Sequence, residues 1–256
     1  MVTFLIIAIA TLSLTCIWLL SKSRSKKSFL PATMQSLTEI PQLSKLSQEE
    51  FDLIAPHLEI LELENDTCLI KEHGRDDSVY FVMKGSINIV KAGAIYQTLI
   101  KELHQGEFFG EMAFLTGACR IASAITNSKA TFLRIKKNAY DNLCKVSPKL
   151  IEEIWLACEY HTISLCMADH EELRNQTTEA KDLWIAGRKT TIGGEYHHES
   201  HEYPWLAIIS GQILIKSREI KSPAVIHTPT SPIEVSDHTR LCWLKPAVLN
   251  KREHSS

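Results

Sequence analysis

The sequence predicts a mainly β protein with flanking helices, in which an N-terminal transmembrane helix precedes two tandem antiparallel β-rolls. Three observations support this. Residues 2–20 contain no charged side chain. Short apolar runs separated by glycine turns recur between residues 68 and 135, and a second series begins near residue 183. Many short strands with such turns are typical of β-rolls and barrels.

The uncharged run over residues 2–20 predicts a membrane anchor. A helix of this length would span roughly 28 Å, close to the hydrocarbon thickness of a bilayer. A cleaved signal peptide is the alternative, but it would have a basic segment before the apolar core and small residues at its cleavage site. Nothing basic precedes the run, which ends in Trp18, Leu19 and Leu20. We therefore expect an uncleaved anchor over residues 1–21.

A basic cluster after the apolar run predicts its orientation. Lys22, Arg24, Lys26 and Lys27 follow the run directly, within a basic and polar linker that we place at residues 22–37. The positive-inside rule puts this side of the anchor in the cytoplasm. The 7 cysteines are odd in number and lack metal-ligand spacing, which agrees with a reducing compartment. The sequence thus predicts a single-pass membrane protein with cytoplasmic domains.

The charge balance of the remaining chain argues against nucleic acid as a partner. Residues 37–256 carry 24 basic and 30 acidic side chains, whereas nucleic-acid affinity depends on neutralising phosphates. The sequence also contains no nucleophile–base pair, P-loop or metal-hydrolase motif. We therefore expect a sensor or scaffold rather than an enzyme.

The first predicted roll begins with helices. Residues 43–63 read as short helices, and Ser47 with Glu50 forms a capping box. Apolar runs then predict successive strands at residues 68–70, 79–83, 87–90, 96–100, 122–125 and 131–135.

Residues 106–124 interrupt this strand rhythm with a different pattern. Gly110 and Glu111 precede a short apolar turn, and Arg120 follows it. A short helix would point backbone N–H groups at an anion, and an arginine can donate two hydrogen bonds to the same anion. Glu111 is suited to accept a hydrogen bond from a hydroxyl group such as a ribose 2′-OH. Together these residues predict a nucleotide cradle.

The segment resembles the phosphate-binding cassette of cyclic nucleotide-binding domains, whose pattern is F-G-E-x-A-L followed by P-R-x-A-[ST]. The matching sequences are FGEMAF at 109–114 and CRIAS at 119–123, and GRDDSVYFVMKG at 74–85 is similar to the family's G-x(n)-Y-x-V-x-x-G hairpin. The resemblance covers about residues 38–170 and implies a jelly-roll domain that binds cAMP or a related cyclic nucleotide. It assigns the ribose 2′-OH to Glu111 and the cyclic phosphate to Arg120. The other binding residues that it implies are Gly110, Met112, Ala113, Ile121 and Ala122.

Two positions depart from the family pattern. Cys119 replaces the usual proline, and Ile121 stands where a small or hydroxylated residue often helps to hold the phosphate. An isoleucine offers no side-chain hydrogen bond, which weakens the case for cGMP in particular. The alternative is that Arg120 and Glu111 pair with each other in a relic site, which would leave a scaffold or interaction protein.

A helix is predicted after the first roll, because Ser147 is a capping residue and Pro148 suits a first helical position. Apolar residues at helical spacing follow it. The resemblance implies a helix that folds over the base, so Trp155 or Tyr160 could stack on a purine. Packing of the same stripe against the roll is the alternative.

The second predicted roll, over residues 183–250, echoes the first. Residues 205–216 parallel residues 80–91, and residues 233–246 parallel residues 122–137, which indicates an internal duplication. The apolar runs that predict its strands are residues 183–186, 205–209, 212–215, 233–235 and 241–244.

The second copy is shorter where the first has its cassette. From Gly85 to Phe132 is 47 residues, whereas from Gly211 to Leu241 is 30. We therefore expect the second roll to lack a nucleotide site and to serve packing, homodimerisation or binding of a membrane protein partner.

A histidine cluster raises a second alternative, a cupin-like metal site. His197, His198, His201 and Glu202 lie close together, and imidazole and carboxylate groups bind divalent metals. Their H-H-x-x-H-E order departs from the H-x-H pattern of cupins. An exposed polar hairpin tip is the simpler interpretation, so no metal or other cofactor is assigned.

Overall fold

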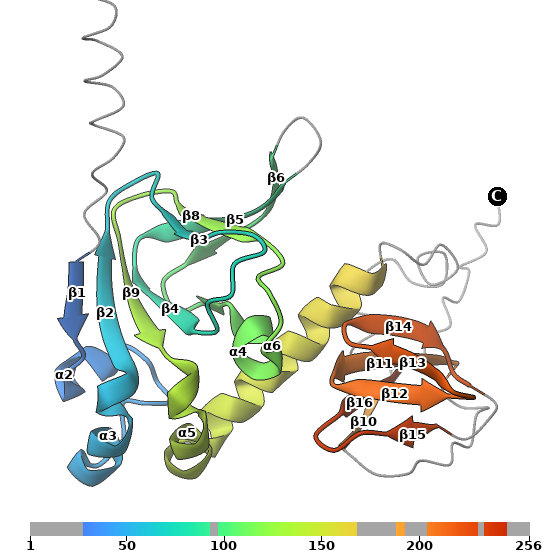
Figure 1. Ribbon diagram of the computed structural model, residues 1–256. Coiled ribbons are helices and arrows are strands. Elements are labelled where there is room, and N and C mark those ends of the chain that lie inside the picture. The colour runs from blue at the N-terminus through green and yellow to red at the C-terminus, as the bar shows by residue number, and fades with distance from the viewer. Residues whose placement is uncertain (1–27, 93–96, 168–187, 193–203, 230–232, 245–256) are drawn as a thin grey trace, which may run out of the picture. The chain divides into compact units, whose positions relative to one another are not determined.

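A computed structural model describes residues 28–92, 97–167, 188–192, 204–229 and 233–244 (Figure 1). The described residues form two compact units. The first runs to Gly110 and resumes over Cys119–Asn142, while the second contains Glu111–Ala118 and the described residues from Leu143 onward. The predicted anchor lies outside the described residues. Within them, no helix is both long and apolar enough to span a membrane.

The first unit opens on an edge strand and two short helices. β1 (Ser28–Pro31) and α2 (Met34–Leu37) lie in a stretch that we expected to be mostly linker. α3 (Gln48–Ile54) begins with the predicted capping box, in which the Ser47 side chain accepts from the Glu50 N–H and the Glu50 carboxylate accepts from the Ser47 N–H. The short 3₁₀ helix η1 (Ala55–His57) follows it.

Two antiparallel sheets form the body of the first unit, which is a β-roll (Figure 1). One has the strand order β1-β2-β9-β4-β7 and the other the order β3-β8-β5-β6. Their strands are β2 (Leu58–Leu63), β3 (Cys68–Ile70), β4 (Val79–Lys84), β5 (Ser86–Ala92), β6 (Gln97–His104), β7 (Phe108–Phe109), β8 (Ser123–Thr126) and β9 (Ala130–Ile135).

The expectation of helix as far as residue 63 is wrong for residues 58–63. These residues form β2, which pairs antiparallel with β9 from Leu58 opposite Ile135 to Leu63 opposite Ala130. β1 pairs on the other edge of β2. Both edges of the strand therefore have hydrogen-bonding partners, and this long-range pairing decides the conformation of an apolar stretch that periodicity alone leaves ambiguous.

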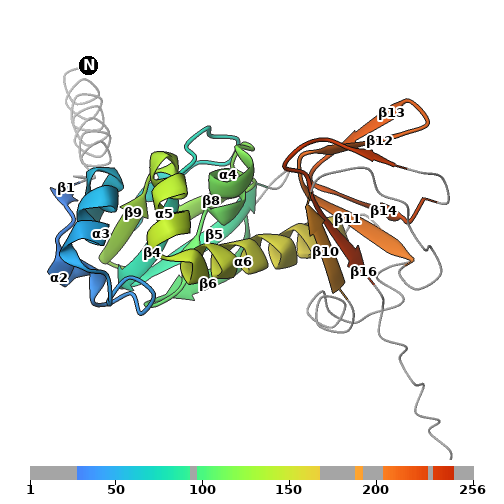
Figure 2. The same cartoon turned by 90° about the horizontal axis from the view of Figure 1, so that it is seen from below.

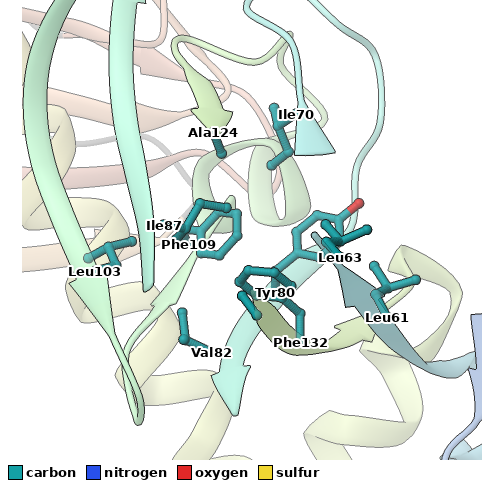
Figure 3. Close-up of a cluster of buried hydrophobic side chains, with 11 residues drawn as sticks. Leu61, Leu63, Ile70, Tyr80, Val82, Ile87, Leu103, Phe109, Ala124 and Phe132 are labelled. Atoms are coloured by element: carbon teal, nitrogen blue, oxygen red, sulfur yellow. The ribbon is translucent and has the colours of Figure 1, made fainter. Parts of the chain in front are cut away.

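The core of the first unit lies between its two sheets (Figure 3). The Tyr80 ring stacks on Phe109 with centroids 5.4 Å apart, and Phe109 meets Phe132 edge-on at 5.9 Å. Such pairs add about 0.5–1.5 kcal/mol to the burial of their area. This packing fixes β4 and β7, and β7 leads directly into Gly110 and the predicted site.

The second unit begins with helices. α4 (Glu111–Thr116) packs against α6 (Pro148–Met167), which starts at the predicted proline (Figure 2). Directly before α6 in sequence lie α5 (Tyr140–Val146) and, in the first unit, η2 (Lys137–Ala139). α6 also packs on strands of a C-terminal sheet.

Two small sheets complete the second unit, with strand orders β10-β16-β11-β14 and β13-β12-β15. Four predicted runs coincide with β11, β12, β15 and β16, whereas residues 183–186 lie outside the described part of the chain. That these sheets are a degenerate second roll stays a prediction. The strands are β10 (Arg188–Ile192), β11 (Trp205–Ser210), β12 (Gln212–Ile215), β13 (Arg218–Lys221), β14 (Ala224–His227), β15 (Glu234–Val235) and β16 (Arg240–Leu244).

Candidate functional site

Arg120 is held in the first unit by its backbone as well as by its side chain. Its N–H donates to the Gly74 carbonyl (2.9 Å), and its own carbonyl accepts from the His73 N–H (2.8 Å). This pairing turns the side chain into the unit, where the residue is only 4% exposed.

The buried guanidinium of Arg120 is largely surrounded by oxygen atoms of the protein itself. Nη1 donates to the Gly110 carbonyl at 2.8 Å, and Nη2 donates to the Ser78 carbonyl at 2.5 Å and to Asp76 Oδ2 at 3.0 Å. Nε is also buried, and it has no hydrogen-bond partner among the described residues. A buried donor without an acceptor costs about 1–3 kcal/mol, so this N–H is suited to an additional anionic oxygen.

Asp76 is the partner of Arg120 in the candidate site that the sequence reasoning missed. Besides Arg120, its carboxylate accepts hydrogen bonds from the Tyr80 hydroxyl, the Ser78 N–H (3.1 Å) and Arg134 Nη2 (3.2 Å). Burial raises the pKa of Asp76, but the Tyr80 hydrogen bond and the Arg120 charge outweigh it and lower the pKa to about 2. The signal in the sequence was an acidic pair just before a strand, 44 residues away from the arginine.

The Asp76 network predicts a pH-dependent stability. The pKa of Asp76 is lowered from 3.8 to about 2 in the folded chain. The ionised carboxylate therefore adds to the free energy of unfolding above pH 4, and this addition is lost as the pH falls toward 2. The carboxylate is partly exposed, so we expect Asp76→Asn to cost only about 1–2 kcal/mol at pH 7.

Urea unfolding at pH 7 and at pH 3 measures this effect. The difference in the free energy of unfolding between wild type and Asp76→Asn should be smaller at pH 3 than at pH 7. The neighbouring exposed residue gives the control, Asp77→Asn, which should unfold like the wild type at both values. If this difference were equal at the two pH values, the lowered pKa of Asp76 in the folded chain would be contradicted.

Gly110 meets the requirement that the predicted cassette places on it. Its φ is +86°, and a Cβ atom there would lie 2.5 Å from Arg120 Nη1 and 3.0 Å from the Ser78 carbonyl oxygen. A side chain would therefore be strained by the backbone conformation and would also displace the arginine.

Glu111 opens α4 in the second unit and is 5% exposed. Its Oε1 atom lies 2.7 Å from Nδ1 of His161 on α6. The structure shows one ion pair between Arg120 and Asp76 and another between Glu111 and His161. The Arg120–Glu111 pair of the relic-site alternative stays a prediction.

The other cassette residues differ in burial. Met112 and Ala113 are buried within α4, whereas Ile121 and Ala122 are partly buried ahead of β8. The side chain of Ile121 provides no polar atom, as the sequence indicated. Their predicted role as close contacts of a ligand stays a prediction.

The two residues expected to stack on a base both lie on α6. The Arg240 guanidinium sits over the Trp155 ring, 4.6 Å from its centroid. Tyr160 is partly buried, with its ring 5.5 Å from that of His161. Arg240 also donates to Oε1 of the fully buried Glu159, at 2.7 Å from Nε and 2.6 Å from Nη2. No local sequence pattern indicates this pair, because 81 residues separate its members.

The candidate metal ligands His197, His198, His201 and Glu202 lie outside the described residues. Within the described ranges, no group of three or more His, Cys, Asp or Glu residues is placed to hold a metal ion. The metal alternative gains no support from this part of the chain.

Comparison with known proteins agrees with this geometry. Residues 60–147 match the family model described as the cyclic nucleotide-binding domain. These residues form a cyclic nucleotide-binding domain. The matched range contains Asp76, Gly110, Glu111 and Arg120, so the buried arginine and the cassette glycine lie within the domain.

Relatives of the domain occur in larger proteins. The cAMP-dependent protein kinase regulatory subunit of Mucor circinelloides is 26% identical over 53% of this chain and 33% of that protein. The subunit of Pyricularia oryzae is 33% identical over 42% of this chain and 27% of that protein. Neuropathy target esterase sws of Drosophila sechellia is 30% identical over 43% of this chain and 8% of that protein. The chain thus spans a third or less of these relatives.

A solved structure of similar fold is a cyclic nucleotide-binding domain from Methylobacillus flagellatus. It is 19% identical to this chain, with a TM-score of 0.45, and the match covers 56% of this chain and 89% of that one. By sequence, the domain at residues 60–147 is similar to the domains of cAMP-dependent protein kinase regulatory subunits.

Proposed function

We propose that this chain is a membrane-anchored, non-enzymatic sensor whose first β-roll binds cAMP. In this proposal Arg120 contacts the cyclic phosphate and Glu111 accepts a hydrogen bond from the ribose 2′-OH. The observation that carries it is the buried Arg120, whose Nε–H has no acceptor among the described residues, while Nη1 and Nη2 both donate to protein oxygens. A phosphate oxygen would satisfy that donor.

Asp76 gives ligand binding a competitor within the protein. The Asp76 carboxylate already accepts a hydrogen bond from Arg120 Nη2 at 3.0 Å. An incoming phosphate would therefore have to share the guanidinium with this carboxylate or displace it. We expect modest affinity as a result, since two anions beside one cation repel each other.

The same observation favours a second candidate function, a scaffold that binds no nucleotide. In that case Asp76 permanently neutralises Arg120, and the domain keeps only its architecture. The degenerate second roll, which lacks a cassette, would then be the part that binds a homodimer partner or a membrane protein.

Thermal unfolding of the full chain in mild detergent separates the two functions. A ligand that binds only the folded state raises the melting temperature according to its concentration relative to Kd. We expect cAMP to raise it, cGMP to raise it less, and 5′-AMP, which lacks the cyclic phosphate, to leave it unchanged. Equal melting temperatures with and without cAMP would favour the scaffold.

The membrane anchor is a separate part of the proposal and rests on residues 2–20 with the basic cluster that follows them. The cluster would hold the folded domains in the cytoplasm. Alkaline extraction of membranes tests the anchor: the full chain should stay in the membrane pellet. A chain released into the supernatant would contradict this proposal and leave the nucleotide proposal unaffected.

A further inference from the structure

The pair between Glu159 and Arg240 ties α6 to the C-terminal sheets within the second unit. Glu159 lies on α6 and is 0% exposed, while Arg240 opens β16 and donates to Glu159 Oε1 from both Nε and Nη2, at 2.7 and 2.6 Å. Removing one partner of such a pair leaves a charge buried without compensation, and this is strongly unfavourable. The position of α6 therefore depends on Arg240.

Arg240 contacts α6 at two consecutive turns. Its guanidinium lies over the Trp155 ring at 4.6 Å, and Trp155 precedes Glu159 by four residues, so both are on one face of the helix. A cation over an indole ring and a charge-assisted hydrogen bond are both directional. Together they fix the rotation of α6 about its own axis as well as its distance from β16.

His161 lies two residues after Glu159, about 200° around the helix. From that side its Nδ1 meets Glu111 Oε1 of α4 at 2.7 Å. The His161 side chain is 41% exposed, whereas that of Glu111 is 6% exposed. Because the imidazole is only partly enclosed, the backbone of α6 and the contact with Glu111 set its place. A turn or shift of α6 would move it away from the carboxylate.

We propose that Arg240 is a positioning residue for nucleotide binding, acting through Glu159 and α6 on the His161–Glu111 pair. The inference rests on the proposed function, because Glu111 is there assigned to the ribose 2′-OH. It gives the C-terminal sheets a role in nucleotide binding through α6. Their strand β16 holds the helix that orients the ribose-binding carboxylate.

A positioning role of Arg240 can be distinguished from a general destabilisation of the fold by which ligands lose affinity. Arg240 acts on the carboxylate that receives the 2′-OH, so its loss should weaken only ligands that carry this hydroxyl. The probes are cAMP and 2′-deoxy-cAMP, and the measurement is Kd by calorimetry on the full chain in detergent. The variants are Arg240→Gln and Arg240→Lys, with Arg218→Gln on exposed β13 as the matched control.

Couplings between distant sites are commonly 5- to 150-fold, so we expect Arg240→Gln to weaken cAMP about 10-fold. The Kd for 2′-deoxy-cAMP should stay the same, Arg240→Lys should recover part of the loss, and Arg218→Gln should bind like the wild type. If Arg240→Gln does not fold, Glu159→Gln replaces it, because this variant removes the buried charge and keeps the oxygen acceptor. The same selective loss is expected.

Two results would overturn the inference while the proposed function stands. One is an unchanged cAMP affinity in both Arg240→Gln and Arg240→Lys. The other is an equal loss of affinity for cAMP and 2′-deoxy-cAMP, which would indicate a structural role only. A wild-type chain that binds neither nucleotide would instead remove the proposed function, and this inference with it.

Discussion

Replacing Arg120 with alanine should weaken cAMP binding by about 100-fold or more, because truncating one partner of a buried charge pair commonly costs 2–5 kcal/mol. The guanidinium is the buried cation assigned to the cyclic phosphate. Its removal would leave the Asp76 carboxylate, which also accepts hydrogen bonds from the Tyr80 hydroxyl and from Arg134, close to where the phosphate would sit. Calorimetry on the purified chain measures the change.

A matched control exists for Arg120→Ala. Arg75 lies next to Asp76 in sequence but is exposed, so Arg75→Ala removes the same charge from the surface. This variant should bind cAMP within about twofold of the wild type, since exposed charges contribute little. Equal losses in the two variants would indicate a general electrostatic attraction and would contradict a specific role for Arg120.

Gly110→Ala should have the second large effect, a loss of at least about 10-fold in cAMP affinity. A Cβ at this position would lie 2.5 Å from Arg120 Nη1 and would force the guanidinium to move. Movement breaks the hydrogen bond from Nη1 to the Gly110 carbonyl. The same calorimetric titration measures the affinity, and unfolding of the variant reports its stability.

Gly106 separates this displacement from simple backbone strain. Its φ is +89°, close to that of Gly110, but a Cβ there would meet nothing within 4 Å. Both alanine variants should therefore pay a similar conformational cost of about 1–2 kcal/mol in stability. Only Gly110→Ala should lose affinity. A comparable loss in Gly106→Ala would show that strain, rather than the position of Arg120, decides binding.

Local signals predicted much of the first unit and the start of α6 correctly. The capping box at Ser47 and Glu50 and the helix start at Pro148 are both present, because such signals depend on residues a few positions apart. All six strands predicted for the first roll coincide with observed strands, which are β3, β4, β5, β6, β8 and β9. β2 was missed because its apolar residues fit a helix as well as a strand, and the distant β9 decided between them.

The candidate site shows the same division. The cassette motif named Gly110, Glu111 and Arg120 from a single contiguous segment. It could not name Asp76 or His161, whose contacts with the cassette bridge 44 and 50 residues. Side-chain pairs of this kind depend on how β4 and α6 are placed by their cores, and no local pattern encodes that placement. Arg120 and Glu111 could be predicted from the motif, whereas their partners Asp76 and His161 could not.

The most direct test of the central claim is the stoichiometry of cAMP binding to the full chain by isothermal titration calorimetry. A cassette in the first domain and none in the C-terminal sheets predicts one molecule of cAMP per chain. It also predicts that this heat is lost in Arg120→Ala. The absence of any heat from a folded wild-type chain, or two equivalent sites per chain, would contradict the account.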